Sequence, residues 1–392
     1  MPQCAGGTTT QLQGGALRSL LVGLLGVVPA SVLAAQWSIE PQLSWALNYN
    51  SNLLLASSGA QASGGMQLSL DSIFKRATET TELDLHPHVD AQRFFSDDAL
   101  NAVNDSIQGS FARHAERTSF TLSGGHERAS TLVTELSDTG IIDANTRRET
   151  SSGTLTLGRD LSERQHLDLQ GGYVNVVYPG GEAAGLVGYH YPNASLSDTY
   201  RYSDRVTLGA AVYADQVTAP STDYDAHDLG LRVSWSLQFS ERTKLTVAGA
   251  YNETSTNGLV QHGYLWDLHS TRNSERTQWD LEWSRTLQPS GSGFLIRRDS
   301  VNLAASHALT QRLDATLALQ DVHNSNVEGG NFTGISTYLS TDTGLSWHFT
   351  EQIVLSLTAG IAESQQTEAQ TVHGWHTALT TTWIPIPRSI SR

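Results

Sequence analysis

The densest group of ionisable side chains in this 392-residue chain lies in one short segment, where every second residue carries a carboxylate or an imidazole. The group comprises Glu82, Asp84, His86, His88 and Asp90. Such side chains are competent ligands for a divalent cation. In an extended strand they would share one face at a spacing of about 7 Å, too far apart to complete a coordination shell alone. Two interpretations remain open, a cation site completed by neighbouring strands and a solvated polar wall with partners such as Arg113, and we assign no metal site.

The elements that would position this group follow from a hydrophobic pattern of period two. From Leu229 to Phe239 every second residue is apolar, and the residues between are small or polar. That alternation is typical of a β-strand with one apolar and one polar face. The pattern stops at a polar turn, 240–243, and resumes from Leu245 to Tyr251. It therefore predicts two antiparallel strands joined in a hairpin.

Polar turns of this kind recur along the chain at a spacing of roughly 35 to 47 residues. They fall at 76–79, 114–117, 162–164, 203–205, 240–243, 274–276, 310–312 and 350–352. The expected hairpins cover 37–75, 81–114, 118–160, 165–200, 205–239, 243–271, 277–309, 313–348 and 353–384. Nine hairpins predict about eighteen strands with both termini on the periplasmic side. Sixteen strands is the alternative, if 274–276 belongs to a long outer loop.

Composition indicates which solvent the apolar faces meet. Arg18 precedes an apolar run from Leu20 to Leu33 with small residues at its end, which predicts a secretory signal peptide over 1–35. Only 16% of the residues are charged, yet the mean hydropathy is −0.28. An average typical of soluble proteins is expected of a membrane barrel, because only alternate strand residues face lipid. We predict an all-β fold in which 36–392 forms a single transmembrane antiparallel up-and-down β-barrel in the bacterial outer membrane; a soluble β-sandwich or propeller is the competing fold.

Aromatic residues recur near the ends of the predicted strands on the apolar parity. They are Trp37, Trp45, Tyr49, Trp235, Trp279, Trp283, Trp375 and Trp383. Amphipathic rings gather at the level of lipid headgroups. The pattern predicts a pair of interfacial girdles and makes outer-membrane lipid an expected partner.

Four short segments resemble the outer-membrane β-barrel porin families of the beta-barrel porin 2 type. They are the opening segment Trp37 to Trp45, the segment Tyr49 to Leu53, the segment Leu287 to Gly293, and the closing pair Thr382-Trp383. These families are often associated with exopolysaccharide systems, so the resemblance implies a barrel that serves polysaccharide export. The chain departs from many such barrels at its end, because Pro385 and a polar tail follow Trp383.

If the apolar parity faces lipid, the opposite parity lines the interior. The expected interior residues with charge are Glu40, Glu82, Asp84, His86, His88, Asp90, Arg232, Asp280, Glu282, Arg312 and Asp314. An eighteen-strand barrel is wide enough for an aqueous channel unless loops fold into it, and 128–145 is a candidate for such a loop. A polar wall suits small hydrated solutes or polysaccharide. The net charge of −15 disfavours anions and argues against nucleic acid as a partner.

Two further classes of function stay open beside the channel. One is a loop-plugged scaffold barrel that anchors periplasmic export proteins, and the other, minor one is a barrel-embedded hydrolase. The fourteen histidines are scattered without a local motif that identifies a nucleophile. We therefore expect no enzyme, assign no catalytic residues and expect no cofactor.

Overall fold

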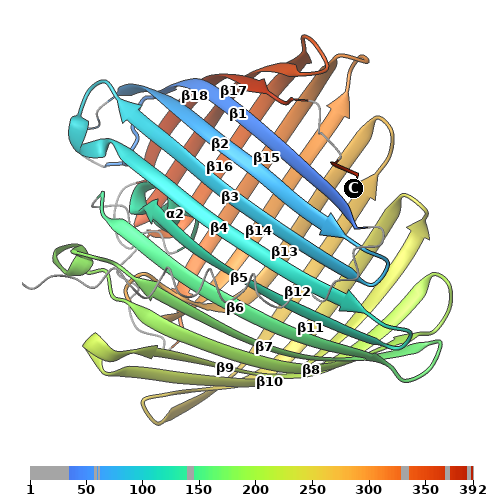
Figure 1. Cartoon of the computed structure of the whole chain (residues 1–392). Coiled ribbons are helices and arrows are strands. Elements are labelled where there is room, and N and C mark those ends of the chain that lie inside the picture. The colour runs from blue at the N-terminus through green and yellow to red at the C-terminus, as the bar shows by residue number, and fades with distance from the viewer. Residues whose placement is uncertain are drawn as a thin grey trace, which may run out of the picture. The chain divides into compact units, whose positions relative to one another are not determined.

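The computed structural model describes residues 35–56, 60, 62–138, 145–327, 335–366, 371–385 and 390–391 (Figure 1). Within it, Gln36–Ser391 forms one compact unit. The strands are β1 Gln36–Asn50, β2 Ser63–Ala77, β3 Thr81–Phe94, β4 Ala102–His114, β5 Thr118–Ser130, β6 Arg147–Asp160, β7 Gln165–Val177, β8 Tyr189–Arg201, β9 Val206–Ala219, β10 Tyr224–Ser240, β11 Thr243–Thr256, β12 Leu259–Asn273, β13 Thr277–Pro289, β14 Leu295–Ala308, β15 Leu313–Asn326, β16 Ile335–His348, β17 Ile353–Gln366, β18 Val372–Trp383 and the short β19 Ile390–Ser391. The described helices are α2 Thr131–Asp138 and the 3-10 turns η1 Asp98–Leu100, η2 Gly181–Ala184 and η3 Pro220–Thr222. The predicted signal peptide falls on residues outside the described ranges, apart from Ala35, and stays a prediction.

The strands form a closed antiparallel ring in chain order. Each strand from β1 to β17 pairs with the next, and β18 pairs back onto β1, for example at Leu47 with Leu379. The two-residue strand β19 adds to the start of β1, at Gln36 and Trp37. The prediction of an all-β, eighteen-strand up-and-down barrel is confirmed. No helix in the described part of the chain is long and apolar enough to cross a membrane.

The eight predicted turns all connect neighbouring strands at one end of the barrel, the end that also holds β19. The turn 274–276 joins β12 to β13, which decides for eighteen strands over sixteen. Several turns share one device, a hydroxyl that accepts a hydrogen bond from the amide three residues later. The distances are 3.1 Å from the Gln165 amide to Ser162, 3.1 Å from Val206 to Ser203, 3.1 Å from Thr277 to Ser274 and 3.0 Å from Ile353 to Thr350. This local bond satisfies a backbone donor and stabilises the reversal.

Large apolar side chains cover the outside of the ring. Leu43, Leu70 and Val89 face one another across β1 to β3, and all are exposed. The same parity carries exposed Leu231, Val212 and Tyr251 across β9 to β11. An exposed apolar surface that encircles a closed barrel requires lipid as its solvent. This is the architecture of proteins of the bacterial outer membrane.

Charged pairs mark the other end of this outer surface, where the longer loops lie. Arg128 donates to Asp105 at 2.8 Å between β4 and β5. His262 lies 3.8 Å from Glu253 between β11 and β12, and His373 lies 3.3 Å from Glu363 between β17 and β18. These residues share the parity of the apolar exterior but follow it toward the loops. The apolar band therefore ends at a polar row on the side of the long loops.

Candidate functional site

Two histidines of the predicted ionisable group on β3, His86 and His88, are held by a carboxylate from the neighbouring strand. Asp71 of β2 lies 2.6 Å from His86 Nε2 through Oδ1 and 3.0 Å from His88 Nδ1 through Oδ2. Asp71 was not among the predicted residues, although its place on the polar parity of β2 was a usable signal. Arg113, the expected partner, lies instead opposite Thr81 and Phe120, on the parity of the exposed Ile107 of β4.

Asp90 continues this line of polar contacts toward the loops. It is buried, accepts a hydrogen bond from Asn104 at 3.2 Å and from Gln67 at 3.4 Å, and lies 3.5 Å from His88 Nε2. No group of three or more histidine, cysteine or acidic side chains in the described residues could hold a metal ion. The ionisable group on β3 is thus part of a network of paired polar side chains along β2, β3 and β4.

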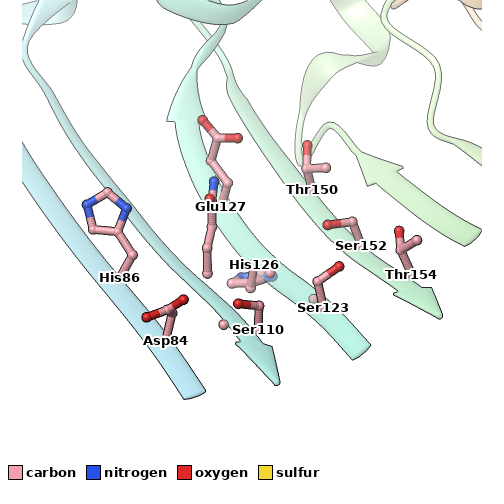
Figure 2. Close-up of a pocket in the computed structure, with 13 residues that line it drawn as sticks. Asp84, His86, Ser110, Ser123, His126, Glu127, Thr150, Ser152 and Thr154 are labelled. Atoms are coloured by element: carbon pink, nitrogen blue, oxygen red, sulfur yellow. The ribbon is translucent and has the colours of Figure 1, made fainter. Parts of the chain in front are cut away.

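A hollow of about 430 Å³ opens on the inner wall beside this network. Figure 2 shows its lining side chains, which come from β3, β4, β5 and β6. Asp84, His86, His126 and Glu127 supply the ionisable groups. The hydroxyl groups belong to Ser110, Ser123, Thr150, Ser152 and Thr154. The wall therefore offers hydroxyl, carboxylate and imidazole groups that can form hydrogen bonds with water.

The other predicted interior residues lie apart from this hollow. Glu40 is on β1 and Glu82 begins β3, while Arg232 of β10 lies 3.5 Å from Asp267. Asp280 lies 2.9 Å from His269, Glu282 accepts from Ser284 at 3.2 Å, and Asp314 lies 2.9 Å from His348. Arg312 lies in the turn between β14 and β15. These residues are distributed around the ring and form no single site, and their role in lining a channel stays a prediction.

The predicted girdle residues are on the outer parity. Seven of them are exposed, namely Trp37, Trp45, Tyr49, Trp235, Trp283, Trp375 and Trp383. Tyr49 and Trp375 contact each other near the loops, with ring centres 4.9 Å apart. Arg76 and Arg272 lie over Trp37 and Trp279 at the opposite end, at 5.6 and 5.4 Å. Whether these rings mark the lipid interfaces stays a prediction.

The helix α2 lies at the end of the barrel that carries the long loops (Figure 1). It directly follows β5, and its Glu135 is fully buried. Tyr178 donates a hydrogen bond to Glu135 at 2.9 Å, and Arg148 of β6 lies 3.8 Å away. Burial and the charge of Glu135 raise the pKa of Tyr178, which keeps the phenol protonated as a donor.

Leu132 attaches the same helix to a distant part of the ring. It packs against a buried cluster of Leu55, Val322 and Tyr338, contributed by the β1–β2 loop, β15 and β16. Glu135 meanwhile contacts β6 and the residue that follows β7. The helix therefore connects two separate arcs of the wall, and we call it with its contacts the mouth helix. Residues 128–145 were predicted as a loop that could fold inward; of these, 128–130 belong to β5 and 131–138 to α2, 139–144 lie outside the described residues, and the inward fold stays a prediction.

The tip of the β13–β14 hairpin also contacts distant strands. The amide of Leu295 donates to Tyr224 Oη at 3.1 Å, and the amide of Val187 donates to the carbonyl of Gly291 at 2.8 Å. Leu295 lies in a buried apolar cluster with Val176, Val217 and other residues of the arc from β7 to β10. As a result β12 and β13 pair over only eight residue pairs, from Trp266 with Arg285 to Asn273 with Gln278.

A second hollow, of about 390 Å³, is lined by residues of the arc from β7 to β13. Its ionisable and phenolic lining residues are Tyr191, Tyr213, Asp215, Asp228, Arg232, Asp267 and Arg285. Of these only Arg232 was predicted, because the alternation identifies an inner face but not which inner residues converge. The described part of the interior therefore has a hollow with polar lining residues on each of these two arcs.

Solved outer-membrane proteins resemble this fold at low sequence identity. The outer membrane protein opdK from Pseudomonas aeruginosa is 10% identical with a TM-score of 0.47, over 90% of this chain and 99% of that one. OccAB2 of Acinetobacter baumannii is 12% identical with a TM-score of 0.47, over 89% and 98%. The outer membrane channel DcaP of Acinetobacter baumannii is 10% identical with a TM-score of 0.46, over 92% and 99%. No family model and no curated protein matches the sequence.

Proposed function

We propose that this barrel is a porin-like channel of the bacterial outer membrane that passes small hydrated solutes or saccharides. The observation that carries the proposal is the division of side chains by parity. Apolar residues such as Leu70 and Leu231 are exposed outside, while Asp84, Glu127 and Ser152 line a hollow within. A wall of hydroxyls and carboxylates can replace the hydrogen bonds of a solute's hydration shell without binding the solute deeply.

The charge of the wall supports a weak preference for cations. The chain carries a net charge of −15, and the first hollow contains two carboxylates and two histidines. A negative potential in a narrow, low-dielectric passage concentrates cations over anions. We expect permeability to sodium to exceed permeability to chloride, and the excess to fall at high salt because the field is screened.

Single-channel recording in planar bilayers under a salt gradient tests the proposal. The wild-type protein should give discrete steps and a cation-selective reversal potential. The double variant Asp84→Asn/Glu127→Gln should lower the cation-to-anion permeability ratio. Glu363→Gln, which removes a carboxylate from the outer surface, is the matched control and should leave that ratio unchanged. A folded wild-type protein without steps, or equal changes in both variants, would contradict the proposal.

The mouth helix favours a second candidate, a plugged scaffold that anchors periplasmic export proteins. Its support is the full burial of Glu135 and the packing of Leu132 on a distant arc. Breaking a buried charged contact costs about 3–5 kcal/mol, so a closed mouth would open rarely. This candidate predicts a silent wild-type barrel, a conducting Glu135→Ala variant, and co-purification of periplasmic proteins with the wild type. Steady wild-type conductance without co-purifying proteins would contradict it.

A saccharide as the transported solute is supported by the resemblance to porin families of exopolysaccharide systems and by the five hydroxyl side chains of the first hollow. Oligosaccharides that enter should block the current transiently. Neutral maltooligosaccharides should therefore give longer blocks than polyethylene glycol of equal hydrodynamic size. Equal block durations for the two polymers would show that the wall does not distinguish saccharides.

A further inference from the structure

Two carboxylates face each other in the second hollow. Asp215 of β9 and Asp228 of β10 are directly paired in the antiparallel register and share the inner parity. Like charges in such cross-strand pairs are destabilising. Nearby cations do not neutralise them, because Arg232 lies against Asp267 at 3.5 Å and Arg285 binds Asp299 through two hydrogen bonds. The pair is therefore a negative centre inside the barrel that no arginine side chain neutralises, and the phenol of Tyr191 hydrogen-bonds Asp215.

Asp228 is held in place with one oxygen unused. The residue is only 4% exposed. Its Oδ1 accepts hydrogen bonds from Asn252 Nδ2 and Thr254 Oγ1, both at 2.6 Å. Its Oδ2 has no hydrogen-bond partner among the described residues. A buried polar atom without a partner costs free energy, so the fixed carboxylate has an acceptor available for a ligand.

Two tyrosines complete the hollow. Tyr191 and Tyr213 line it beside the acidic pair, and the phenol of Tyr213 lies close to Asp228. The ring of Tyr213 lies over Gly230, where a Cβ would overlap the ring atoms. Glycine at this position lets the ring lie against the β10 backbone beside the carboxylates. Aromatic faces attract cations in addition to the Coulomb attraction of the carboxylates.

We propose that this hollow binds an organic cation with a primary ammonium group through Asp228 and Asp215, between the rings of Tyr191 and Tyr213. A volume of about 390 Å³ suits a small molecule rather than a bare ion. Asp267 also lines the hollow, but no group of three acidic or histidine side chains in the described residues is arranged to hold a metal ion. An ammonium group donates three hydrogen bonds and can satisfy both carboxylates at once. The inference rests on the proposed channel function, since it identifies a class of solute that the channel would select.

Isothermal titration of the detergent-purified protein with putrescine tests the site directly. Putrescine should bind saturably, and 1,4-butanediol, which has the same length but no charge, should bind at least tenfold more weakly. Asp228→Asn and Asp215→Asn should each weaken putrescine binding at least tenfold. Asp84→Asn is the matched control, because it removes a carboxylate from the other hollow, and it should change the affinity by less than twofold.

Several outcomes would overturn the site. Equal binding of putrescine and butanediol would remove the role of charge, and this comparison needs no variant should Asp228→Asn fail to fold. An equal loss in Asp84→Asn would show a diffuse electrostatic effect. If the wild-type protein bound calcium but not putrescine, and Asp228→Asn abolished the calcium binding, the hollow would be a metal site instead. Putrescine binding in detergent without conductance in bilayers would support this site and contradict the proposed channel function. Conductance in bilayers without putrescine binding would support the channel function and contradict this site.

Discussion

Adjacent residues on β10 allow the same charge to be placed on opposite faces of the wall. Val233 lies on the outer surface, 58% exposed, with Ala210 and Gly249 beside it on β9 and β11. Ser234 has the opposite parity and is flanked by Gly209 and Ala248. We expect Val233→Arg to destabilise the inserted barrel and Ser234→Arg to leave its stability nearly unchanged.

The magnitude follows from the height of Val233 in the apolar band. The apolar exterior of β10 extends from Leu229 to Phe239. At about 3.3 Å per residue and a tilt of about 40°, this stretch is about 25 Å high. Val233 lies near its centre, where an arginine facing lipid costs about 2–4 kcal/mol. That cost is about a 30- to 900-fold change in the folding equilibrium constant.

Guanidinium unfolding from lipid vesicles, followed by tryptophan fluorescence, measures both variants against the wild type. Val233→Arg should lower the free energy of unfolding by the amount above. Ser234→Arg should lower it by less than about 0.5 kcal/mol, the usual effect of a change at a solvated position. Equal losses in the two variants, or no loss in Val233→Arg, would refute the assignment of this parity to lipid.

The same assay checks two further predictions. Arg285 binds Asp299 at 2.5 and 2.7 Å and lies 3.9 Å from the ring centre of Trp266. Arg285→Met should therefore lower the free energy of unfolding by about 1–3 kcal/mol, and adding Asp299→Asn should restore part of that loss. An Arg285→Met variant as stable as the wild type would contradict the prediction. A Cβ on Gly65 would lie 2.8 Å from the carbonyl oxygen of Arg93, whereas one on Gly171 would meet nothing within 4 Å. Gly65→Ala should lower the free energy of unfolding by about 1–3 kcal/mol, whereas Gly171→Ala should leave it nearly unchanged. Equal losses of stability in the two variants would contradict this prediction.

The strand order could be predicted because its determinants are local. Several turns depend on a hydroxyl and an amide three residues apart, as at Ser274 and Thr277. Each strand face depends on alternation within about ten residues, as in β10. Once hairpins follow one another with short turns, the antiparallel ring is the simplest closure, and the register of one hairpin constrains the next.

The mouth helix and the second hollow could not be predicted because their determinants are distant in the chain. Leu132 packs on Val322 and Tyr338, about 190 to 206 residues further along. Asp215 and Asp228 come from one hairpin, but the partners that hold Asp228 come from β11. The alternation of apolar and polar residues identifies the side of the wall that a residue faces. It carries no information on which inner residues meet when the ring curves.

The short pairing between β12 and β13 makes the ring unequally stiff around its circumference. From Leu259 to Leu265, β12 is paired with β11 on one edge, while in the described residues no strand pairs with its other edge. Every second amide of that stretch therefore lacks the ladder bond that protects its counterparts elsewhere. These amides should exchange with deuterium well before those of β3 or β17. The barrel would begin to unzip there under heat or denaturant, so its resistance to unfolding is set by this arc rather than by the average of eighteen strands.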